Sequence, residues 1–344
     1  MSRILFIGDL NKYSRSYFRY RTLSEMGHDV VAHSHTFVSS PDKIQAPSLL
    51  YRIFWKMRLP LDDMRANKAL KQEASKSCYD VIWIEKGNMI WPRTLAAIKN
   101  LSPNSALISC SEDDMYARHA HSLWYRWGLD KYDCVFSTKT YNLQELKYFG
   151  AHKTKLFLDS YDEKIHKPME LSDADRRHFG CDVGAIGAFE PERAALLEYL
   201  AENGIRVTIW GNGWRNWVGR NSNLDARNEF LYGENYSKAI CGTKINLNFL
   251  RKINRDEVTS RSVEIPACGG FMLAERTERH QEFFVEGREA EFFGSKEELL
   301  AKVRTYLKRE KEREKIAQAG RQRCLRSGYS MRAQLTSILE EVVA

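Results

Sequence analysis

The segment TSRSVEIPACGGFMLAE, residues 259–275, carries a glutamate whose position needs a chemical explanation. The segment is predicted to form a short helix, a glycine pair and a buried strand, with Glu264 in the first turns of the helix. A capping box would need Ser or Thr three residues before the glutamate, but Arg261 stands there and Ser260 lies four residues back. We therefore expect the Glu264 carboxylate to be free to bind a ligand.

The residues around Glu264 suit a nucleotide. A carboxylate at the start of a helix, beside the close-packed pair Gly269 and Gly270, can accept both hydroxyls of a ribose. Arg261, one turn earlier, can neutralise a diphosphate. Asp256 precedes Glu264 with seven residues between them, a spacing that invites comparison with known families.

A glycine loop earlier in the chain, GAIGAFEPERAALL, is a candidate phosphate site. Gly187 follows a predicted strand, and a helix is expected to begin near Pro191. Free backbone N–H groups and the helix dipole favour an anion there, and Arg193 can add a bidentate contact. The pattern is neither GxGxxG nor a P-loop, so a tight turn without a ligand is the alternative.

A second loop, WGNGWRNWVG at residues 210–219, follows the next predicted strand. Gly211, Asn212 and Trp214 can hold a planar base between backbone amides and an aromatic ring. The alternative is that Trp214 and Trp217 only cover the edge of the sheet.

The elements that must position these residues alternate along the chain. RILFIG, YDVIWIEKG, SALISCS and DKYDCVFSTK are predicted strands, while SYFRYRTLSEM, PRTLAAIKN and YNLQELKYFG are predicted helices. After a pause near residues 160–180, the same alternation resumes with CDVGAIG, ERAALLEYLAENG and RVTIWG and ends in a long charged helical region from Lys296. Nearly continuous apolar strands separated by helices indicate an α/β protein with parallel sheets covered on both faces.

Composition limits the class of protein. A chain of 344 residues is long enough for two domains. Its seven cysteines form no CxxC pair, which argues against a zinc site and structural disulfides and favours a reducing cytoplasm. No apolar run approaches the roughly 20 residues of a membrane span.

Positive charge is concentrated near the N-terminus. Residues 1–76 hold 13 Lys and Arg against 7 Asp and Glu, a net +6 of the chain's +8. In LLYRIFWKMRLPLDDMR, residues 49–65, aromatic and basic side chains are interleaved. The segment can be a helix packed on its own domain's sheet, an acceptor-side wall, or an edge that contacts a membrane.

Four segments together resemble the CgeB-like glycosyltransferases, within the GT-B glycosyltransferases that carry an acidic-x7-Glu signature. They are DVGAIGAFEPERAALLEYLAENGIRVTIWGNGW, KINLNF, TSRSVEIPACGGFML and FFGSKEELLAKVRTYL. The resemblance implies two Rossmann-like domains facing a central cleft: an acceptor-binding domain at 1–165 and a domain at 166–325 that binds a nucleotide sugar. It further implies that a helix at 326–344 returns to the first domain.

The resemblance also implies roles for individual residues. It places Glu264 on the nucleotide ribose and Asp256 where the wider group usually has a glutamate that touches the donor sugar. It implies no cofactor and no metal, with a nucleotide sugar such as a UDP-sugar as co-substrate. Arg261, Arg251 and Lys244 are then the cations expected to stabilise the departing diphosphate.

The stereochemistry is left open. The signature implies retention, for which no protein nucleophile is needed. An inverting reaction needs a base, and in the EDD segment Asp113 and Asp114 are the candidates. The alternative for this segment is a solvated loop that caps the following helix.

Two other functions fit parts of the sequence. One is a sugar-nucleotide epimerase of the same fold, which takes no acceptor. The other is a non-catalytic protein that binds an anionic ligand or a membrane surface through the basic residues of the first domain. Nucleic acid is disfavoured because no helix-turn-helix, zinc finger or RNP pattern is present.

Overall fold

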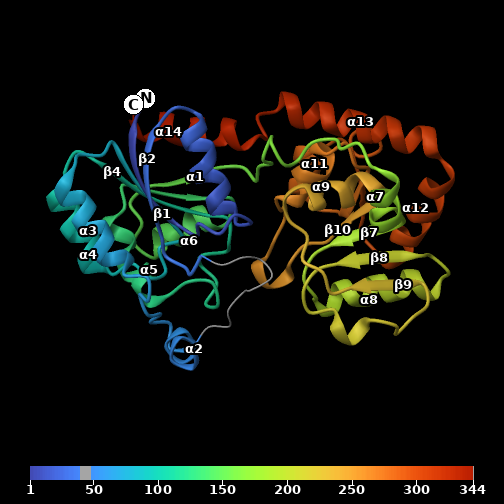
Figure 1. Ribbon diagram of the computed structural model, residues 1–344, viewed down its shortest axis with the longest axis horizontal. Coiled ribbons are helices and arrows are strands. Elements are labelled where there is room, and N and C mark those ends of the chain that lie inside the picture. Colours follow the sequence, from blue (N-terminus) through green and yellow to red (C-terminus); the bar gives the residue numbers. More distant parts are fainter. Residues whose placement is uncertain (39–47, 344) are drawn as a thin grey trace. The chain divides into compact units, whose positions relative to one another are not determined.

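The computed structural model describes residues 1–38 and 48–343. The chain divides into two compact units, one made of Met1–Leu158 and Met331–Ala344 and the other of Asp159–Ser330. Each unit is an α/β layer structure (Figure 1).

The first unit contains a parallel sheet with the strand order β2-β1-β3-β4-β5-β6. Its strands are β1 (Arg3–Gly8), β2 (Asp29–Ser34), β3 (Val81–Glu85), β4 (Ala106–Ser111), β5 (Cys134–Ser137) and β6 (Thr154–Leu156). Its helices are α1 (Arg15–Glu25), α2 (Leu49–Lys56), α3 (Ala66–Lys76), α4 (Pro92–Leu101), α5 (Leu123–Gly128), α6 (Asn142–Tyr148) and α14 (Met331–Val343).

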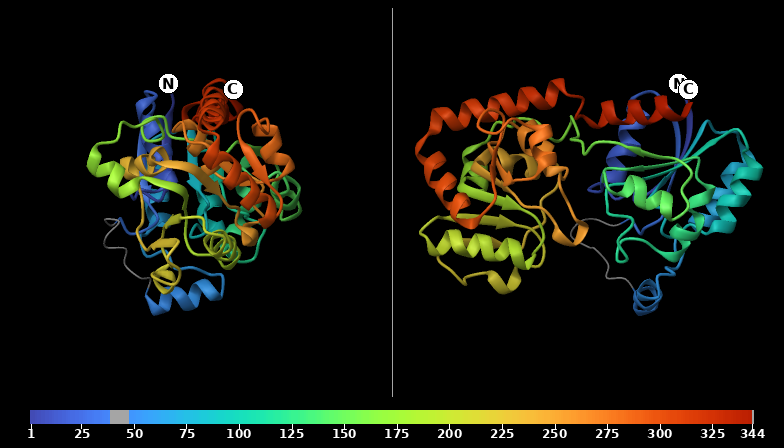
Figure 2. Two further views of the ribbon diagram at one scale, coloured as in Figure 1. Left: turned by 90° about the vertical axis from the view of Figure 1, so that its right-hand side faces the viewer. Right: turned by 180° about the vertical axis from the view of Figure 1, so that it is seen from behind.

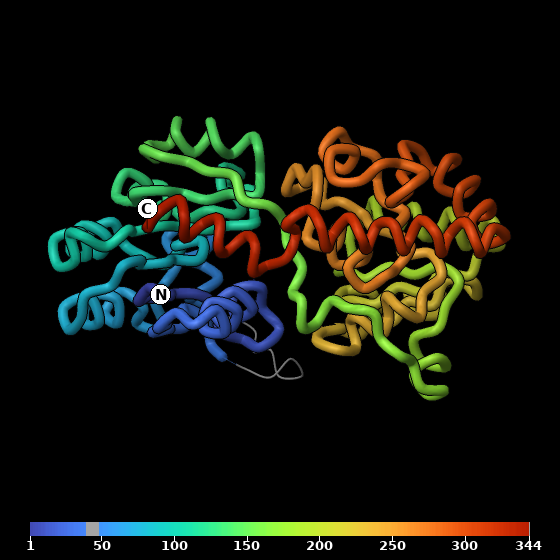
Figure 3. Tube along the Cα trace, turned by 90° about the horizontal axis from the view of Figure 1, so that it is seen from above, coloured from blue at the N-terminus to red at the C-terminus, as the bar shows by residue number. Residues whose placement is uncertain are grey.

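Both faces of this first sheet are covered, as the run of apolar residues in β1 predicts. Leu5 and Ile7 belong to the buried cluster that includes α3 and α4. Phe6 points to the other face, where its ring lies 6.2 Å from that of Tyr20 on α1. Helix α14 belongs to this unit (Figure 3) and buries Met331, among other side chains.

The second unit has a parallel sheet of the same size, ordered β12-β11-β10-β7-β8-β9. Its strands are β7 (Cys181–Ile186), β8 (Val207–Trp210), β9 (Leu224–Arg227), β10 (Thr243–Asn248), β11 (Met272–Glu275) and β12 (Glu291–Phe293). Its helices are α7 (Asp173–Phe179), α8 (Pro191–Glu202), α9 (Gly233–Gly242), α10 (Arg261–Ala267), α11 (Glu278–Phe283), α12 (Lys296–Lys308) and α13 (Glu310–Arg326).

The predicted fold class is confirmed: two parallel six-stranded sheets, each packed between helices. The long charged region from Lys296 forms the helices α12 and α13. In both sheets all strands run the same way, so the residues that follow them gather at one carboxyl edge per sheet. Such edges carry ligand sites in α/β proteins.

Candidate functional site

Two glycine turns meet at the carboxyl edge of the second sheet. Gly187 follows β7 and donates its backbone N–H to the carbonyl of Trp210 at 2.8 Å. Gly211 follows the neighbouring strand β8 and has a φ of +148°, which a side chain rarely adopts. A Cβ at Gly211 would overlap the carbonyl group of Gly187, so the two turns are in direct contact.

Arg193 lies in the first turn of α8, beside the Gly187 turn, and is 4% exposed. Its guanidinium donates to the carbonyl oxygen of Ala188 and lies over the ring of Phe249. Its Nε has no hydrogen-bond partner, and no carboxylate forms an ion pair with it among the described residues. A buried cation without an anion is costly, and this position therefore favours an anionic ligand.

Two further arginines lie within electrostatic range of Arg193. Burial lowers the pKa of Arg193 to about 10; Arg261 and Arg251 add to this effect, and Glu190 opposes it. Arg261 is the half-buried first residue of α10, whereas Arg251 is exposed after β10 and pairs with Glu190 at 2.6 Å. The structure thus brings these three predicted cations together at one sheet edge.

Asp256 lies in the loop between β10 and α10, and its Oδ2 accepts from the backbone N–H of Arg251 at 3.4 Å. Asn212 is exposed beside Gly211, and its carbonyl accepts from the N–H of Phe189 at 2.8 Å. Both residues therefore lie in loops at the same edge as the arginines.

Glu264 lies in α10 without a capping box, because the side chain of Ser260 makes no cap hydrogen bond. The expectation that its carboxylate is free was wrong. Glu264 is 5% exposed and accepts a hydrogen bond from the hydroxyl of Tyr236 at 2.6 Å. His166 lies close to the other carboxylate oxygen, with Nε2 3.8 Å from Oε1.

Tyr236 and His166 hold this carboxylate in place. The Nδ1 of His166 accepts from the backbone N–H of Asp162 at 2.8 Å, so the proton of a neutral ring sits on Nε2, facing Glu264. Burial raises the pKa of the Tyr236 hydroxyl, and the nearby Glu264 carboxylate raises it further. Tyr236 therefore remains protonated and donates.

A buried polar network fixes the start of α10. Asn248, the last residue of β10, donates to the hydroxyl of Ser262 at 2.9 Å, and Ser262 lies 2.7 Å from Nε2 of His280. Burial lowers the pKa of His280 to about 4, so this ring is neutral at pH 7. The sequence analysis missed these three residues because no short-range pattern joins them.

Trp214 does not form a base-stacking platform. It is fully buried, its indole Nε1 donates to the carbonyl of Gly187 at 2.9 Å, and its ring meets Phe189 edge to face at 5.2 Å. The alternative of a covering side chain is the one that the structure shows. Trp214 contributes indirectly, because its hydrogen bond holds the Gly187 turn.

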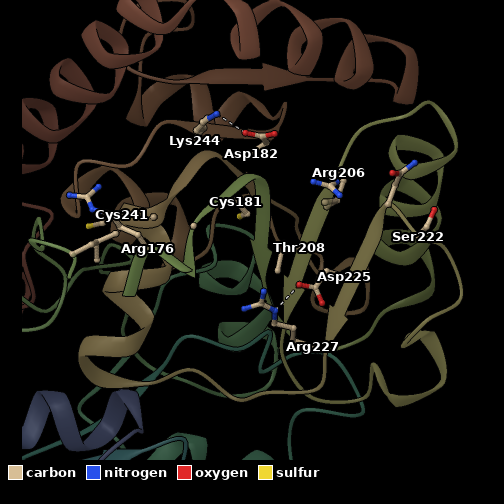
Figure 4. A pocket seen from close by; sticks show the side chains of 15 residues that line it. Arg176, Cys181, Asp182, Arg206, Thr208, Ser222, Asp225, Arg227, Cys241 and Lys244 are labelled. Carbon is tan, nitrogen blue, oxygen red and sulfur yellow. Dashed lines mark hydrogen bonds and ion pairs between the residues drawn. The ribbon is translucent and has the colours of Figure 1, made fainter. Parts of the chain in front are cut away.

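Three further predicted donor-site residues lie elsewhere. Lys244 is the second residue of β10, at the amino edge of the sheet, and pairs with Asp182 at 2.7 Å (Figure 4). Gly269 and Gly270 end α10 and precede β11, so they too lie far from the carboxyl edge. Gly270 is buried, and a Cβ there would press on Ile240. The structure therefore does not bring these three residues to the carboxyl edge with the others.

The amino edge has a pocket of its own, with a volume of about 660 Å³. Four basic side chains line it together with Asp182 and Asp225 (Figure 4): Arg176, Arg206, Arg227 and Lys244. Arg227 pairs with Asp225 at 2.7 Å. This pocket lies on the side of the sheet opposite to the glycine turns.

In the first unit, Asp113 and Asp114 follow β4 but differ in exposure. Asp113 is half-exposed and forms an ion pair with Lys86. Asp114 is fully buried, accepts from Asn142 at 2.8 Å and shapes the following turn by accepting from two backbone N–H groups. The carboxylate of Asp114 is therefore occupied structurally, and only Asp113 remains a candidate base.

Glu112, the first residue of the EDD segment, belongs to an ionic network at the carboxyl edge of the first sheet. Glu112 pairs with Arg15 at 3.0 Å and with Arg19 at 2.5 Å, and Arg19 also pairs with Glu85 at 2.9 Å. Burial disfavours the Glu112 carboxylate, but the arginines outweigh it and lower its pKa to about 2.

Within residues 1–38 and 48–343, no three His, Cys, Asp or Glu side chains are grouped as metal ligands. In the same part of the chain, no helix combines the length and hydropathy that a membrane crossing requires.

Comparison with known proteins shows what the second unit and the whole fold are similar to. Residues 193–340 match the model of a family described as glycosyl transferase-like. The fold resembles that of HepE from Anabaena, solved in complex with UDP and glucose: TM-score 0.68, 12% identity, 99% of each chain covered. The chain is a glycosyltransferase of the GT-B fold.

Other solved structures share the fold of this glycosyltransferase. Sucrose-phosphate synthase from Thermosynechococcus elongatus superposes with a TM-score of 0.66 at 13% identity, over 99% of this chain and 98% of that one. A glycosyltransferase from Rickettsia africae superposes with a TM-score of 0.63 at 11% identity, over 99% of this chain and 97% of that one. A search of curated proteins found no match.

Proposed function

We propose that this glycosyltransferase takes its sugar from a nucleotide-sugar donor bound at the carboxyl edge of the second sheet. The observation that carries the proposal is Arg193, a buried guanidinium beside the Gly187 turn with no carboxylate partner among the described residues. Arg251 and Arg261 lie within electrostatic range of it. A diphosphate would supply the missing negative charge.

UDP is the first nucleotide to test, because the fold relative from Anabaena was solved with UDP and with UDP-glucose. In this proposal Glu264 accepts the ribose hydroxyls, and its hydrogen bond from Tyr236 fixes the carboxylate for that contact. Asp256 stands where the wider group has a glutamate near the donor sugar. We assign the chain to the CgeB-like subfamily on the sequence segments described above.

The chemistry follows from where charge develops. As the bond to the sugar breaks, negative charge grows on the leaving diphosphate, and preorganised cations stabilise it. Arg193, Arg251 and Arg261 supply that charge, so we propose transfer without a metal or other cofactor. We further propose retention at the anomeric carbon, because the acidic-x7-Glu signature implies it. If transfer inverts, Asp113 is the base to examine, since Asp114 is buried.

The acceptor is a glycan, a lipid-linked molecule or a protein, and we propose a cytoplasmic location.

A thermal-shift screen with UDP-, GDP-, ADP- and CDP-sugars tests the donor directly, because a bound ligand raises the unfolding temperature. Arg261→Ala should then weaken binding of the matching nucleoside diphosphate much more than binding of the bare nucleoside. Equal losses of affinity for both ligands would mean that Arg261 has a structural role. Sugar interconversion without any acceptor would indicate an epimerase instead, and EDTA should leave transfer unchanged.

A further inference from the structure

Helix α2 (Leu49–Lys56) presents its apolar side chains to solvent. None of its residues is buried in the described structure, although six of the eight are apolar or aromatic. Leu49 is 71% exposed, Leu50 63% and Ile53 44%, and Met57, just after the helix, is 56% exposed. Figures 1 and 2 show α2 standing away from the sheet of its own unit. The expectation of a helix packed on that sheet was therefore wrong.

The exposed side chains share one face. Leu49, Ile53 and Met57 follow one another at intervals of four residues, and Leu50 lies beside them at helical spacing. Arg52 and Lys56, also four residues apart and exposed, border this face on one side. The half-buried rings of Tyr51 and Trp55, stacked 6.3 Å apart, lie on the opposite face of the helix. The result is an apolar stripe with a basic row along one side.

A basic pocket of about 420 Å³ adjoins the helix, lined by Trp55, Lys56, Arg58, Arg118, His119 and His121. Burial lowers the pKa of Arg58, and the nearby cations Arg118 and Arg126 lower it further. Arg58 also contacts the ring of His121, whose pKa burial and Arg58 lower to about 4. Such a gathering of cations favours an anion.

We propose that α2 and the adjoining pocket form a peripheral docking surface for an anionic lipid bilayer. Leu49, Leu50, Ile53 and Met57 enter the boundary between headgroups and acyl chains. Arg52 and Lys56 contact lipid phosphates, and the arginine pocket receives a headgroup. This surface lies in the first unit, so the inference goes beyond the donor proposal and does not depend on it.

The arrangement of side chains favours a lipid surface over a protein partner. Basic side chains beside an apolar stripe can extend their charged ends to phosphates while the stripe is immersed. The net +6 of residues 1–76 adds attraction to anionic lipid. One carboxylate, Asp63, lies near Tyr51, on the helix face opposite to the apolar stripe.

The test is co-sedimentation of the full-length protein with phosphatidylcholine vesicles, with and without phosphatidylglycerol, at low and at raised salt. We expect binding that needs phosphatidylglycerol and falls with salt. Each basic residue near the surface contributes roughly five-fold to partitioning, so Arg52→Gln with Lys56→Gln should weaken binding roughly 25-fold. Leu50→Ser with Ile53→Ser should weaken it at least as much.

Matched controls are available on α13. Lys311 and Lys315 are exposed and four residues apart on a helix, like Arg52 and Lys56, and Leu325 is 51% exposed. Lys311→Gln with Lys315→Gln, and Leu325→Ser, should leave vesicle binding unchanged. Hydrogen exchange of the unmodified protein gives a second measurement, in which residues 49–57 should become protected by anionic vesicles.

Absence of vesicle binding at low salt would overturn the proposal, and so would binding that the α2 variants do not reduce. Protection that falls outside residues 49–57 would also overturn it. A dimer in light scattering that Leu50→Ser with Ile53→Ser dissolves would assign this face to a protein interface instead. Donor-induced thermal shifts, read in the same variants, report separately on the second unit.

Discussion

The hydroxyl of Tyr236 donates a 2.6 Å hydrogen bond to the carboxylate of Glu264, joining α9 to α10 in the second unit. Because the acceptor is a buried charge, Tyr236→Phe should lower the free energy of unfolding by about 1.5–3 kcal/mol. Tyr132→Phe is the control, since that buried hydroxyl has no hydrogen-bond partner in the described part of the chain. Calorimetric unfolding of both variants measures the difference. Similar values for the two would mean that the bond to Glu264 adds nothing.

Glu264→Gln keeps the shape of the side chain and removes its charge. If Glu264 binds the ribose, donor affinity should fall by about 1–3 kcal/mol, because a charge-assisted hydrogen bond becomes a neutral one. Titration calorimetry with the donor found in the screen measures this loss. Unchanged affinity would count against the ribose assignment.

Arg193→Met should increase the stability of the ligand-free protein while weakening the binding of a nucleoside diphosphate. Burial lowers the pKa of Arg193 from its ordinary value to about 10, so the buried charged form costs stability at every pH below 10. In the wild type, stability should rise as the pH increases above 10. Removing the charge should therefore raise the free energy of unfolding at pH 7 by about 1–3 kcal/mol.

Arg227→Met is the matched control for this variant, because the Arg227 side chain lines the second unit's other pocket and pairs with Asp225. It should show no gain in stability and unchanged diphosphate binding. Denaturant titration and calorimetry measure the two effects. Wild-type diphosphate affinity in Arg193→Met would refute the role given to Arg193.

Gly211→Ala tests the contact between the two glycine turns. The new methyl group would overlap the carbonyl of Gly187 at a φ of +148°, and we expect a loss of about 3 kcal/mol or more. Gly219→Ala meets open space at a φ of +73° and should cost only about 1 kcal/mol. Thermal unfolding compares them. If Gly211→Ala loses no more stability than Gly219→Ala, the two glycine turns can move apart without cost.

Glu112→Gln should alter the acid stability of the first unit. The arginines around Glu112 lower its pKa from 4.5 to about 2, so it contributes stability above pH 4.5 that is lost as pH falls to 2. That contribution is about 3 kcal/mol. The variant should be less stable at pH 7 and lose less on acidification, which thermal unfolding across this pH range measures.

Glu85→Gln is the control that separates the effect of Glu112 from that of the neighbouring Glu85. Burial raises the pKa of Glu85 despite its pairing with Arg19, so that residue has the opposite pH dependence. Glu85→Gln should keep the acid-induced loss that Glu112 causes. If both variants lose stability identically with acid, Glu112 is not the group responsible.

The fold could be predicted because its signals are local. Apolar strand runs such as RILFIG and helix starts such as Pro92 and Pro191 fall where the structure has β1, α4 and α8. The Gly187 turn and Arg193 were found for the same reason, since a strand end and the first turn of the next helix lie six residues apart.

Long-range contacts explain most of what was missed. The partner of Glu264 lies 28 residues away, on another helix, and no spacing rule points to it. In the sequence of a glycine-rich loop nothing distinguishes an exposed tryptophan from a buried one, so the burial of Trp214 could not be predicted. The position of Lys244 could have been predicted from the sequence. Lys244 is the second residue of its strand, and parallel strands place their first residues at the amino edge of the sheet.

The order in which the two units can complete their folding during synthesis follows from the place of α14. Residues 159–330 form the second unit as one continuous segment, whereas the first unit needs residues 331–343 to cover α1 and bury Met331, Leu335, Ile338 and Leu339. Domains usually fold as units during synthesis. On the ribosome, then, the second unit can complete its fold first, and the first unit, begun earlier, has to wait with one helix position open until α14 emerges.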